Sequence, residues 1–599
     1  MEDQRQVFHQ FENKYKSLQG KYHRQYLTTA TIRAVWFILA LVGCIYWANA
    51  RMSSYIWLTL VIAIPIFLVL VKQHRKIQFR KKIAENLSII NAQEIALLEG
   101  NLSSVTDNGE SYKKKTHPFS YDLDLFGKGS LFAFINRSHT LSGKDTLAEW
   151  LQTYATSEEV VDRQEAVTEL SELVEWRQQL QAKSMLADTD RDKLEKLSNW
   201  FDQPSQFLGK PLYKTLIIVL PIILISAIVL WALSIVPSAV PFGFFLLNLG
   251  VLGKHSNYIT NAVEETTKQL STIQSYRLLL SQVEDQPFQA KKLHSMRQLL
   301  LDEPPASQQV LQLEKILNSL EARLNILFSF TVNAVLLFDI NYMIKLEKWK
   351  EVHRHKLQNW LHIIGEFEAL SSLAAYKYAH PDFCMPDVTP TYFRFEAKEL
   401  GHPLIGSSNR VCNDFSMDMS GQLMLVTGSN MAGKSTFQRT LGVNAVLAMA
   451  GAPVCAKEMK ISPCRLFTSM RIEDSLEENI SSFYAELKRI QQLFELLKED
   501  EQVFFLLDEL LRGTNSQDRH KGVKAIIKQL GQTKASGLIS THDLELASLA
   551  DDAPEKITNF SFGSRIENGK LIFDYKLKKG VCSSFSASAL MEQMGIHLE

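Results

Sequence analysis

A glycine-rich segment, Gly428-Ser-Asn-Met-Ala-Gly433-Lys434-Ser435, combines residue types and a spacing that could do chemistry. It fits the pattern G-x-x-x-x-G-K-[ST], with a strand-like run at 423–427 before it and a helix-forming run after it. Backbone N–H groups of such a loop surround phosphate oxygens, and the following helix adds partial positive charge at its start. We expect Lys434 to reach the β- and γ-phosphates of ATP and the Ser435 hydroxyl to bind Mg²⁺. The expected nucleotide contacts from this segment are Gly428, Ser429, Asn430, Met431, Ala432, Gly433, Lys434, Ser435 and Thr436.

Two acidic residues follow a second apolar run, Val-Phe-Phe-Leu-Leu at 503–507. This order is typical of a Walker B segment, in which Asp508 would hold the Mg²⁺ shell and Glu509 would act as general base on the attacking water. The alternative is a surface acidic pair, which the position downstream of the glycine-rich loop disfavours. A third run at 537–540 precedes Thr-His-Asp, so His542 would also lie at a strand end. Spacing alone leaves open whether His542 contacts the nucleotide or is a solvated loop residue.

The elements that must position these residues have an α/β pattern. Beyond Pro386, short β-branched runs alternate with helical segments, which predicts an α/β P-loop domain over residues 386–599. Upstream, apolar residues recur at three- and four-residue spacing over 116–212 and 255–385, which predicts a helical core in two parts. The apolar stretch from Leu324 to Phe338 is short, and we interpret it as a core helix.

Long uncharged runs predict two transmembrane helical hairpins. The chain has 17 uncharged residues between Arg33 and Arg51, and 20 more between Arg51 and Lys72. Another 39 uncharged residues extend over 215–253, with prolines near the middle where a turn would divide them into two spans. About 20 apolar residues suffice to cross a bilayer. A secretory signal is the alternative for the first run, and a buried hairpin in a soluble core is the alternative for the last.

Basic residues set the expected orientation. The segment after the second span reads KQHRKIQFRKK, and the N-terminal arm is also basic, whereas the loop between the first two spans offers only Arg51. The positive-inside rule therefore predicts a multi-pass protein of the inner or plasma membrane, with the N-terminus and the ATPase domain in the cytoplasm. The expected domains are an arm (1–29), a first membrane hairpin (30–75), a helix and linker (76–115), core helices (116–212), a second hairpin (213–254), further core helices (255–385) and the ATPase domain (386–599).

Amino-acid composition excludes few classes of function. Lys and Arg together number 65, as do Asp and Glu, so the formal net charge is zero and gives no support for a dedicated nucleic-acid binder. A local basic patch would still suffice for DNA. The six cysteines include no Cys-x-x-Cys pair, which argues against a zinc site or a disulfide framework.

Four segments together resemble the MutS family of DNA mismatch-repair ATPases. TGSNMAGKSTFQR (427–439) resembles the family's Walker A segment, and LLDELLRGTNSQD (506–518) resembles its Walker B segment and following loop. STHD (540–543) is similar to the family's A-T-H-Y. ENISSFYAEL (478–487) resembles the G-x-S-T-F-x-x-E-M segment that in this family reaches into the ATP site of the partner subunit. The likeness extends upstream to 135–167 and 364–374, and is strongest over 423–545.

The resemblance implies a homodimer and assigns further site residues. It implies that His542 senses the nucleotide, that Ser481 is supplied to the partner's site, and that Val411 to Asn413 form a wall of the adenine pocket. Several positions depart from the family pattern: Ala432, Asn479, Leu511 and Arg519 stand where the family has glycine. Asn479 weakens the assignment of Ser481, and we find no Phe-x-Glu mismatch-recognition motif before residue 116.

Two classes of function remain open. The first is a dimeric, ATP-driven switch that binds DNA near the membrane, as the family implies. The second is a membrane ATPase that acts on a protein or lipid partner without nucleic acid. An ABC-type transporter is disfavoured because four spans are few and no L-S-G-G-Q segment precedes Walker B.

Overall fold

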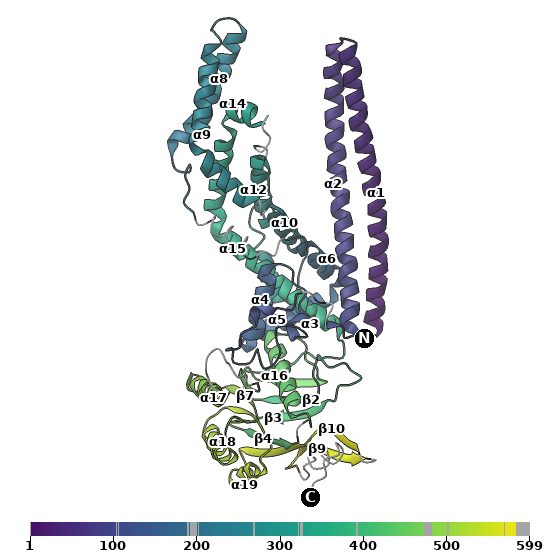
Figure 1. The fold of residues 1–599 in the computed structure, drawn as a ribbon, viewed down its shortest axis with the longest axis vertical. Coiled ribbons are helices and arrows are strands. Elements are labelled where there is room, and N and C mark those ends of the chain that lie inside the picture. The colour runs from purple at the N-terminus through teal and green to yellow at the C-terminus, as the bar shows by residue number, and fades with distance from the viewer. Residues whose placement is uncertain are drawn as a thin grey trace. The chain divides into compact units, whose positions relative to one another are not determined.

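The computed structural model describes residues 2–102, 105, 107–187, 191, 201, 203–267, 270–321, 323, 328–390, 393–429, 431–471, 482–499, 502–567 and 570–582. It divides into two compact units. The first comprises Met1–Asn136, Leu147–Val174 and Leu370–Glu599, and the second comprises Arg137–Thr146 and Glu175–Ala369. The described chain is mostly helical, and its strands lie in the C-terminal part (Figure 1).

The first unit begins with a hairpin of two long helices, α1 (Glu2–Asn49) and α2 (Ser53–Leu98), which run side by side (Figure 1). The polar arm expected at 1–29 and the first apolar run therefore form one continuous helix. Across the pair, the Trp36 indole N–H donates to the carbonyl oxygen of Ala63 at 3.1 Å. Arg51, with φ of 55°, lies in the turn that joins the two helices.

Three described helices are long and apolar enough to cross a membrane, judged by length and composition: α1, α2 and α8 (Pro211–Ala232). The turn expected within the run at 215–253 is found, because α8 ends at Ala232 and α9 (Ala239–Thr267) begins seven residues later. The helix α9 is not among the three, and all four membrane spans stay predictions.

Four short helices of the described chain follow the hairpin. They are α3 (Leu131–Ile135), α4 (Leu141–Gln152), α5 (Ser157–Glu172) and α6 (Val174–Ser184). Of these, α3 and α5 lie within the first unit. Helix α5 begins at a capping box, in which Thr156 and Glu159 each accept from the backbone N–H of the other. The sequence pattern of threonine followed three residues later by glutamate predicts a helix start, and the structure has one at this position.

The C-terminal α/β region predicted from the sequence is confirmed. A six-stranded sheet has the order β10-β9-β4-β8-β7-β6, parallel except that β10 is antiparallel to β9. A four-stranded sheet has the order β1-β5-β2-β3. The strands are β1 (Asp387–Val388), β2 (Phe395–Leu400), β3 (Asn413–Met417), β4 (Leu423–Gly428), β5 (Glu458–Ile461), β6 (Arg465–Ser469), β7 (Val503–Asp508), β8 (Ser536–Thr541), β9 (Ile557–Glu567) and β10 (Lys570–Lys579).

Helices cover the larger sheet. They are α16 (Lys434–Ala450), α17 (Ser482–Glu499), α18 (Ser516–Leu530) and the short α19 (Leu549–Asp552). Every residue of β4, β7 and β8 is buried, as expected for parallel strands covered on both faces. The parallel order brings the carboxyl ends of these strands to one edge, where the side chains that follow them can meet.

The second unit is helical. Its further helices are α10 (Leu270–Asp285), α11 (Lys291–Gln298), α12 (Ala306–Glu321), α14 (Ala334–Leu336) and most of α15 (Phe338–Ala379). A buried carboxylate, Glu347, accepts from the backbone N–H groups of residues 206–208 and from the Tyr258 hydroxyl. These bonds fix the segment before α8 against α15.

The apolar stretch at 324–338 is not the single core helix that the sequence suggests. Its described part contains a π-helical turn at Ser329–Asn333, then α14, and a break at Leu337, whose φ is 48°. Polar side chains compensate for the lost helical bonds. The Asn333 side chain accepts from the Asp339 N–H, and the buried Asn248 amide donates to the Ala334 carbonyl at 2.9 Å.

Candidate functional site

The glycine-rich loop connects the end of β4 to the start of α16. Gly428 has φ of 155°, and a Cβ there would lie 2.8 Å from the carbonyl oxygen of Phe562. Gly433 caps α16 with φ of 101°, a conformation that side-chain-bearing residues rarely adopt. Met431, between them, also has positive φ, 68°. The loop therefore needs glycine at its two ends, for a close approach and for a left-handed cap.

Lys434 is folded back into this loop. Its ammonium group donates to the carbonyl oxygens of Gly428 at 2.8 Å and Ser429 at 2.9 Å, and the side chain is 4% exposed. Burial lowers the pKa of Lys434, and the nearby carboxylates of Glu509 and Asp508 oppose that shift. An ammonium group has three N–H donors, and two of these are used by the carbonyl oxygens, so Lys434 has capacity left for an anion.

Two oxygens expected to hold a divalent cation lie together. The Ser435 hydroxyl donates to Oδ2 of Asp508 at 2.6 Å, and the Ser540 hydroxyl from the end of β8 donates to Oδ1. Asp508 is buried, and the Arg512 guanidinium lies 3.5 Å from its Oδ2. A hydroxyl beside a carboxylate is an oxygen donor set that suits Mg²⁺, which commonly uses one or two protein oxygens and completes its shell with water and phosphate.

Glu509 and His542 meet at the same sheet edge. His542 Nε2 lies 2.5 Å from Oε1 of Glu509, and Arg512 Nε lies 3.2 Å from Oε2. Lys434 Nζ is 4.0 Å from Oε1. The His542 imidazole is the largest cause lowering the pKa of Glu509, while burial opposes it. Glu509 is thus an ionised carboxylate at neutral pH, able to accept a proton.

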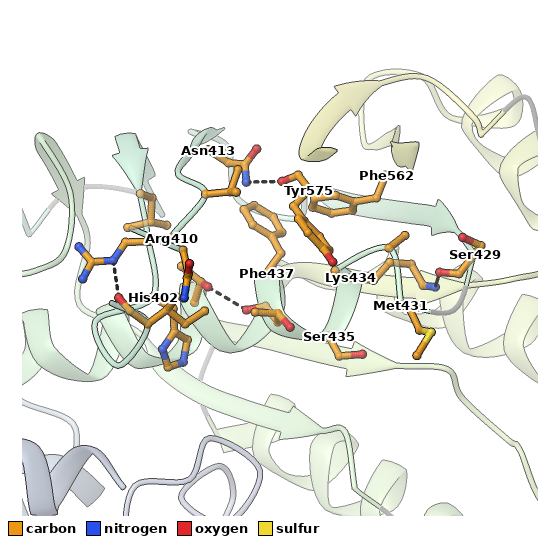
Figure 2. Close-up of a pocket in the computed structure, with 18 of the residues that line it drawn as sticks. His402, Arg410, Asn413, Ser429, Met431, Lys434, Ser435, Phe437, Phe562 and Tyr575 are labelled. Atoms are coloured by element: carbon orange, nitrogen blue, oxygen red, sulfur yellow. Dashed lines mark hydrogen bonds between the residues drawn. The ribbon is translucent and has the colours of Figure 1, made fainter. Parts of the chain in front are cut away.

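A cavity of about 470 Å³ opens beside the loop. Figure 2 shows Lys434, Ser435 and Ser429 on one side of it with Tyr575 and Phe562 beside Lys434, Phe437 near the middle, and His402 and Arg410 on the other side. Burial and the charges of Arg439 and Arg410 lower the pKa of His402 to about 4, so that its ring is neutral at pH 7. The cavity therefore combines the polar groups of the loop with aromatic side chains, of which Tyr575 and Phe562 belong to residues that lie against the loop. Its volume is in the range usual for small-molecule sites.

Asn413 lines this cavity, as the sequence led us to expect, but both ends of its amide are already bonded. Its Nδ2 donates to the Tyr575 carbonyl at 3.0 Å, and its Oδ1 accepts from the Leu577 N–H at 2.8 Å. Figure 2 shows the first of these bonds. Asn413 thus holds β10 at its irregular point, where Tyr575 has φ of 51°. The ring of Tyr575 consequently lies over Gly433, where an added Cβ would be 3.0 Å from its Cδ1.

Two expected site residues, Asn430 and Ser481, lie outside the described residues. Sequence reasoning missed Ser540, Arg512, His402 and Tyr575. The first two stand inside the quoted motifs, so a check of every polar residue there would have found them. Tyr575 and His402 carry no local signal, because they reach the cavity only through the pairing of distant strands.

Comparisons with known proteins agree with this geometry. Residues 424–595 match the family model of MutS domain V. The DNA mismatch repair protein MutS of Thermotoga petrophila is 33% identical over 242 residues, which is 39% of this chain and 29% of that protein. MutS of Staphylococcus aureus is 30% identical over 254 residues, or 40% of this chain and 28% of that protein. This chain is therefore a MutS-family protein through its C-terminal region, and it spans less than a third of the length of these relatives.

Proposed function

We propose, from the premise that residues 424–595 are a MutS domain V, that this chain is a Mg²⁺-dependent ATP hydrolase with a P-loop. The observation that carries the proposal is the meeting of Lys434, the Ser435–Asp508 pair and the Glu509–His542 pair at one sheet edge, where Lys434, Ser435 and Glu509 line the cavity. These residues come from β4 with its loop, from β7 and from β8. A phosphate binder, a cation site and a base at one sheet edge suit phosphoryl transfer to water.

Each of these residues would have a separate role in ATP hydrolysis. Lys434 would exchange its carbonyl partners for the β- and γ-phosphate oxygens of ATP, beside the start of α16. Mg²⁺, held by Ser435 and Asp508, would offset the negative charge that develops on the phosphates. Glu509 would accept the proton of the attacking water, and His542 would keep that carboxylate ionised and oriented.

Phosphate release by the purified full-length protein in detergent tests this proposal. Wild type should hydrolyse ATP only when Mg²⁺ is present, and Lys434→Ala should lose most of its ATP affinity. Lys528→Ala removes an exposed lysine from α18 and should behave as wild type. Hydrolysis that is equal with and without Mg²⁺, or equal in Lys434→Ala, would contradict the assignment.

ATP binding is further proposed to switch a homodimer that contacts DNA. The relatives are named DNA mismatch repair proteins, which supports DNA as the partner. The alternative is a membrane ATPase that acts on a protein or lipid partner. ATPase rates measured with and without duplex, branched and single-stranded DNA separate the two, since only a DNA-coupled enzyme should change its rate.

A site shared between two subunits has its own test. Ser481→Ala subunits mixed with Lys434→Ala subunits should regain partial activity, because one site of a mixed dimer then has an intact loop facing an intact Ser481. Both variants should be nearly inactive alone. If mixed dimers form and activity stays absent, the shared-site model fails.

The chain is also proposed to be a multi-pass protein of the inner or plasma membrane, with its N-terminus and ATPase domain in the cytoplasm. Large apolar side chains project outward from the α1–α2 hairpin, among them Trp57 at 68% exposure and Val61 at 66%. No Asp or Glu occurs between Glu12 and Glu85, whereas basic residues flank the apolar runs. The protein should remain in the membrane pellet after an alkaline carbonate wash and leave it only with detergent. Recovery in the soluble fraction would contradict anchoring.

A further inference from the structure

The turn that follows β7 has an unusual backbone. Glu509 has φ of 51° and Leu511 has φ of 60°, both in the left-handed region that residues other than glycine adopt at a cost. Leu511 stands where the resembling family motif has glycine. Backbone conformations of this kind persist only where the surrounding structure enforces them. We therefore expect neighbouring residues to hold the backbone of Glu509 and Leu511 in this conformation.

That restraint is a carboxylate from a neighbouring helix. Glu486, in the second turn of α17, is 2% exposed and accepts from the backbone N–H groups of Leu511 and, at 3.1 Å, of Arg512. Burial raises the pKa of Glu486, and the two N–H donors and the Arg512 charge act in the opposite direction. Ionised carboxylates make stronger hydrogen bonds to N–H groups than neutral acceptors do.

A second contact joins the same helix to the same turn. A Cβ added to Gly513 would lie 3.0 Å from both the Cβ and the backbone nitrogen of Phe483. The first turn of α17 thus lies directly against the backbone just past Arg512. Two points one helical turn apart, Phe483 and Glu486, therefore hold the segment 511–513.

The held turn contains groups that face the nucleotide loop. Arg512 contacts the carboxylates of Asp508 and Glu509, and Glu509 in turn lies within 4.0 Å of Lys434. A change of φ at Glu509 or Leu511 would rotate these side chains away from their present partners. Displacement of a catalytic group by about 1 Å can cost on the order of 10²-fold in rate.

We propose that Glu486 is a positioning residue for ATP hydrolysis: its buried carboxylate holds the turn 509–512 in the left-handed conformation that aims Glu509 at the end of the cavity. It acts through the backbone and touches no substrate. This inference rests on the proposed ATPase activity, and it adds a residue whose role the nucleotide motifs do not assign.

The test compares Glu486→Gln with a rescue in the turn itself. Glutamine keeps the size but replaces a charged acceptor of two N–H groups by one neutral acceptor, so kcat should fall roughly 10- to 100-fold. ATP affinity, measured with a fluorescent nucleotide, should change little because the loop and Lys434 are untouched. Glu486→Asp, which keeps the charge, should lie between wild type and Glu486→Gln.

Leu511→Gly placed in the Glu486→Gln background should raise kcat about tenfold above that of Glu486→Gln alone, since glycine adopts positive φ without the restraint. The gain should come although the double variant melts at a lower temperature, because Leu511 is buried and its packing is lost. A general loss of stability would predict the opposite result. The matched control is Glu284→Gln, another buried carboxylate that accepts from a backbone N–H, that of Ser307, in the other unit. It should keep the wild-type kcat.

Several results would overturn the inference. Folded Glu486→Gln with wild-type kcat would make Glu486 a structural residue only, and a loss that Leu511→Gly fails to relieve would refute the backbone mechanism. Wild-type protein without hydrolysis is a separate outcome, seen before any variant is made, and it would remove the proposed function together with this inference.

Discussion

Replacement of Glu509 by glutamine is the most direct probe of the chemistry assigned to this site. The carboxylate lies 2.5 Å from His542 Nε2 and 3.2 Å from Arg512 Nε, and the pKa of Glu509 is lowered, so at neutral pH it is charged and can accept a proton. Glutamine has nearly the same shape and cannot accept the proton. Every other expected contact with the nucleotide is left in place.

The expected size of the effect follows from the role of a general base. Loss of such a group costs on the order of 10²- to 10⁴-fold in rate. At about 1.4 kcal/mol for each tenfold change, the barrier should rise by about 3 to 6 kcal/mol. ATP binding should be retained or become tighter. Glu509 is a negative charge 4.0 Å from Lys434, and its removal leaves that ammonium group more available to phosphate.

Two measurements on the same preparation separate these effects. Single-turnover hydrolysis of radiolabelled ATP reports the chemical step, and equilibrium binding of a fluorescent ATP analogue reports affinity. Glu495→Gln, at an exposed position on α17, is the matched control and should leave both unchanged. If Glu509→Gln hydrolysed ATP within about threefold of the wild-type rate, Glu509 would not be the base. The reasoning from the Glu509–His542 pair would then be refuted.

Three further perturbations have defined outcomes. Asn413→Ala leaves its two backbone partners on β10 unpaired and should lower the free energy of unfolding by about 1–3 kcal/mol, measured by chemical denaturation. The pKa of Glu509 is lowered, so this carboxylate stops acting as a base only when the pH falls through its lowered pKa. The substitution His542→Gln removes the largest cause of the lowering and should raise the pKa of Glu509. The acid limb of the kcat/KM profile should therefore move to higher pH. A cysteine at Ser53 should react with impermeant reagents from outside the cytoplasm, whereas one at Lys128 should react only after permeabilisation; the reverse pattern would overturn the proposed orientation.

Local sequence determined much of the site. The loop from Gly428 to Ser435 is specified by glycines at the positions of positive φ and by the apolar strand before it. Asp508 and Glu509 likewise follow a run whose every residue is buried. Parallel strands bring their carboxyl ends to one edge, so Ser435 and Asp508 could be expected at the same edge, whereas their contact at 2.6 Å depends on the order of the strands in the sheet. The turn between α8 and α9 was also readable, from the prolines in an otherwise apolar run.

Other features had no local signal. The helix expected at 324–338 is broken, because buried side chains, Asn333 and Asn248, take over backbone partners, and apolar periodicity does not report such bonds. Asn413 was expected to form a wall of the nucleotide pocket, and it does line the cavity. The sequence did not show that its amide is engaged by β10, 162 residues further along the chain.

The sequence by itself determined the chemical groups of this protein, the elements that carry them and the family of its C-terminal region. Strand propensity, glycine conformation and apolar length are properties of short segments, so they can be read without knowledge of the fold. Tertiary structure alone decided which distant groups complete the site: Ser540 on Asp508, Tyr575 over Gly433, and Glu486 on the turn after β7. Each of these contacts depends on the register of strands or the packing of a helix far along the chain, and a hydrogen bond forms only when such register is correct to within a fraction of an ångström.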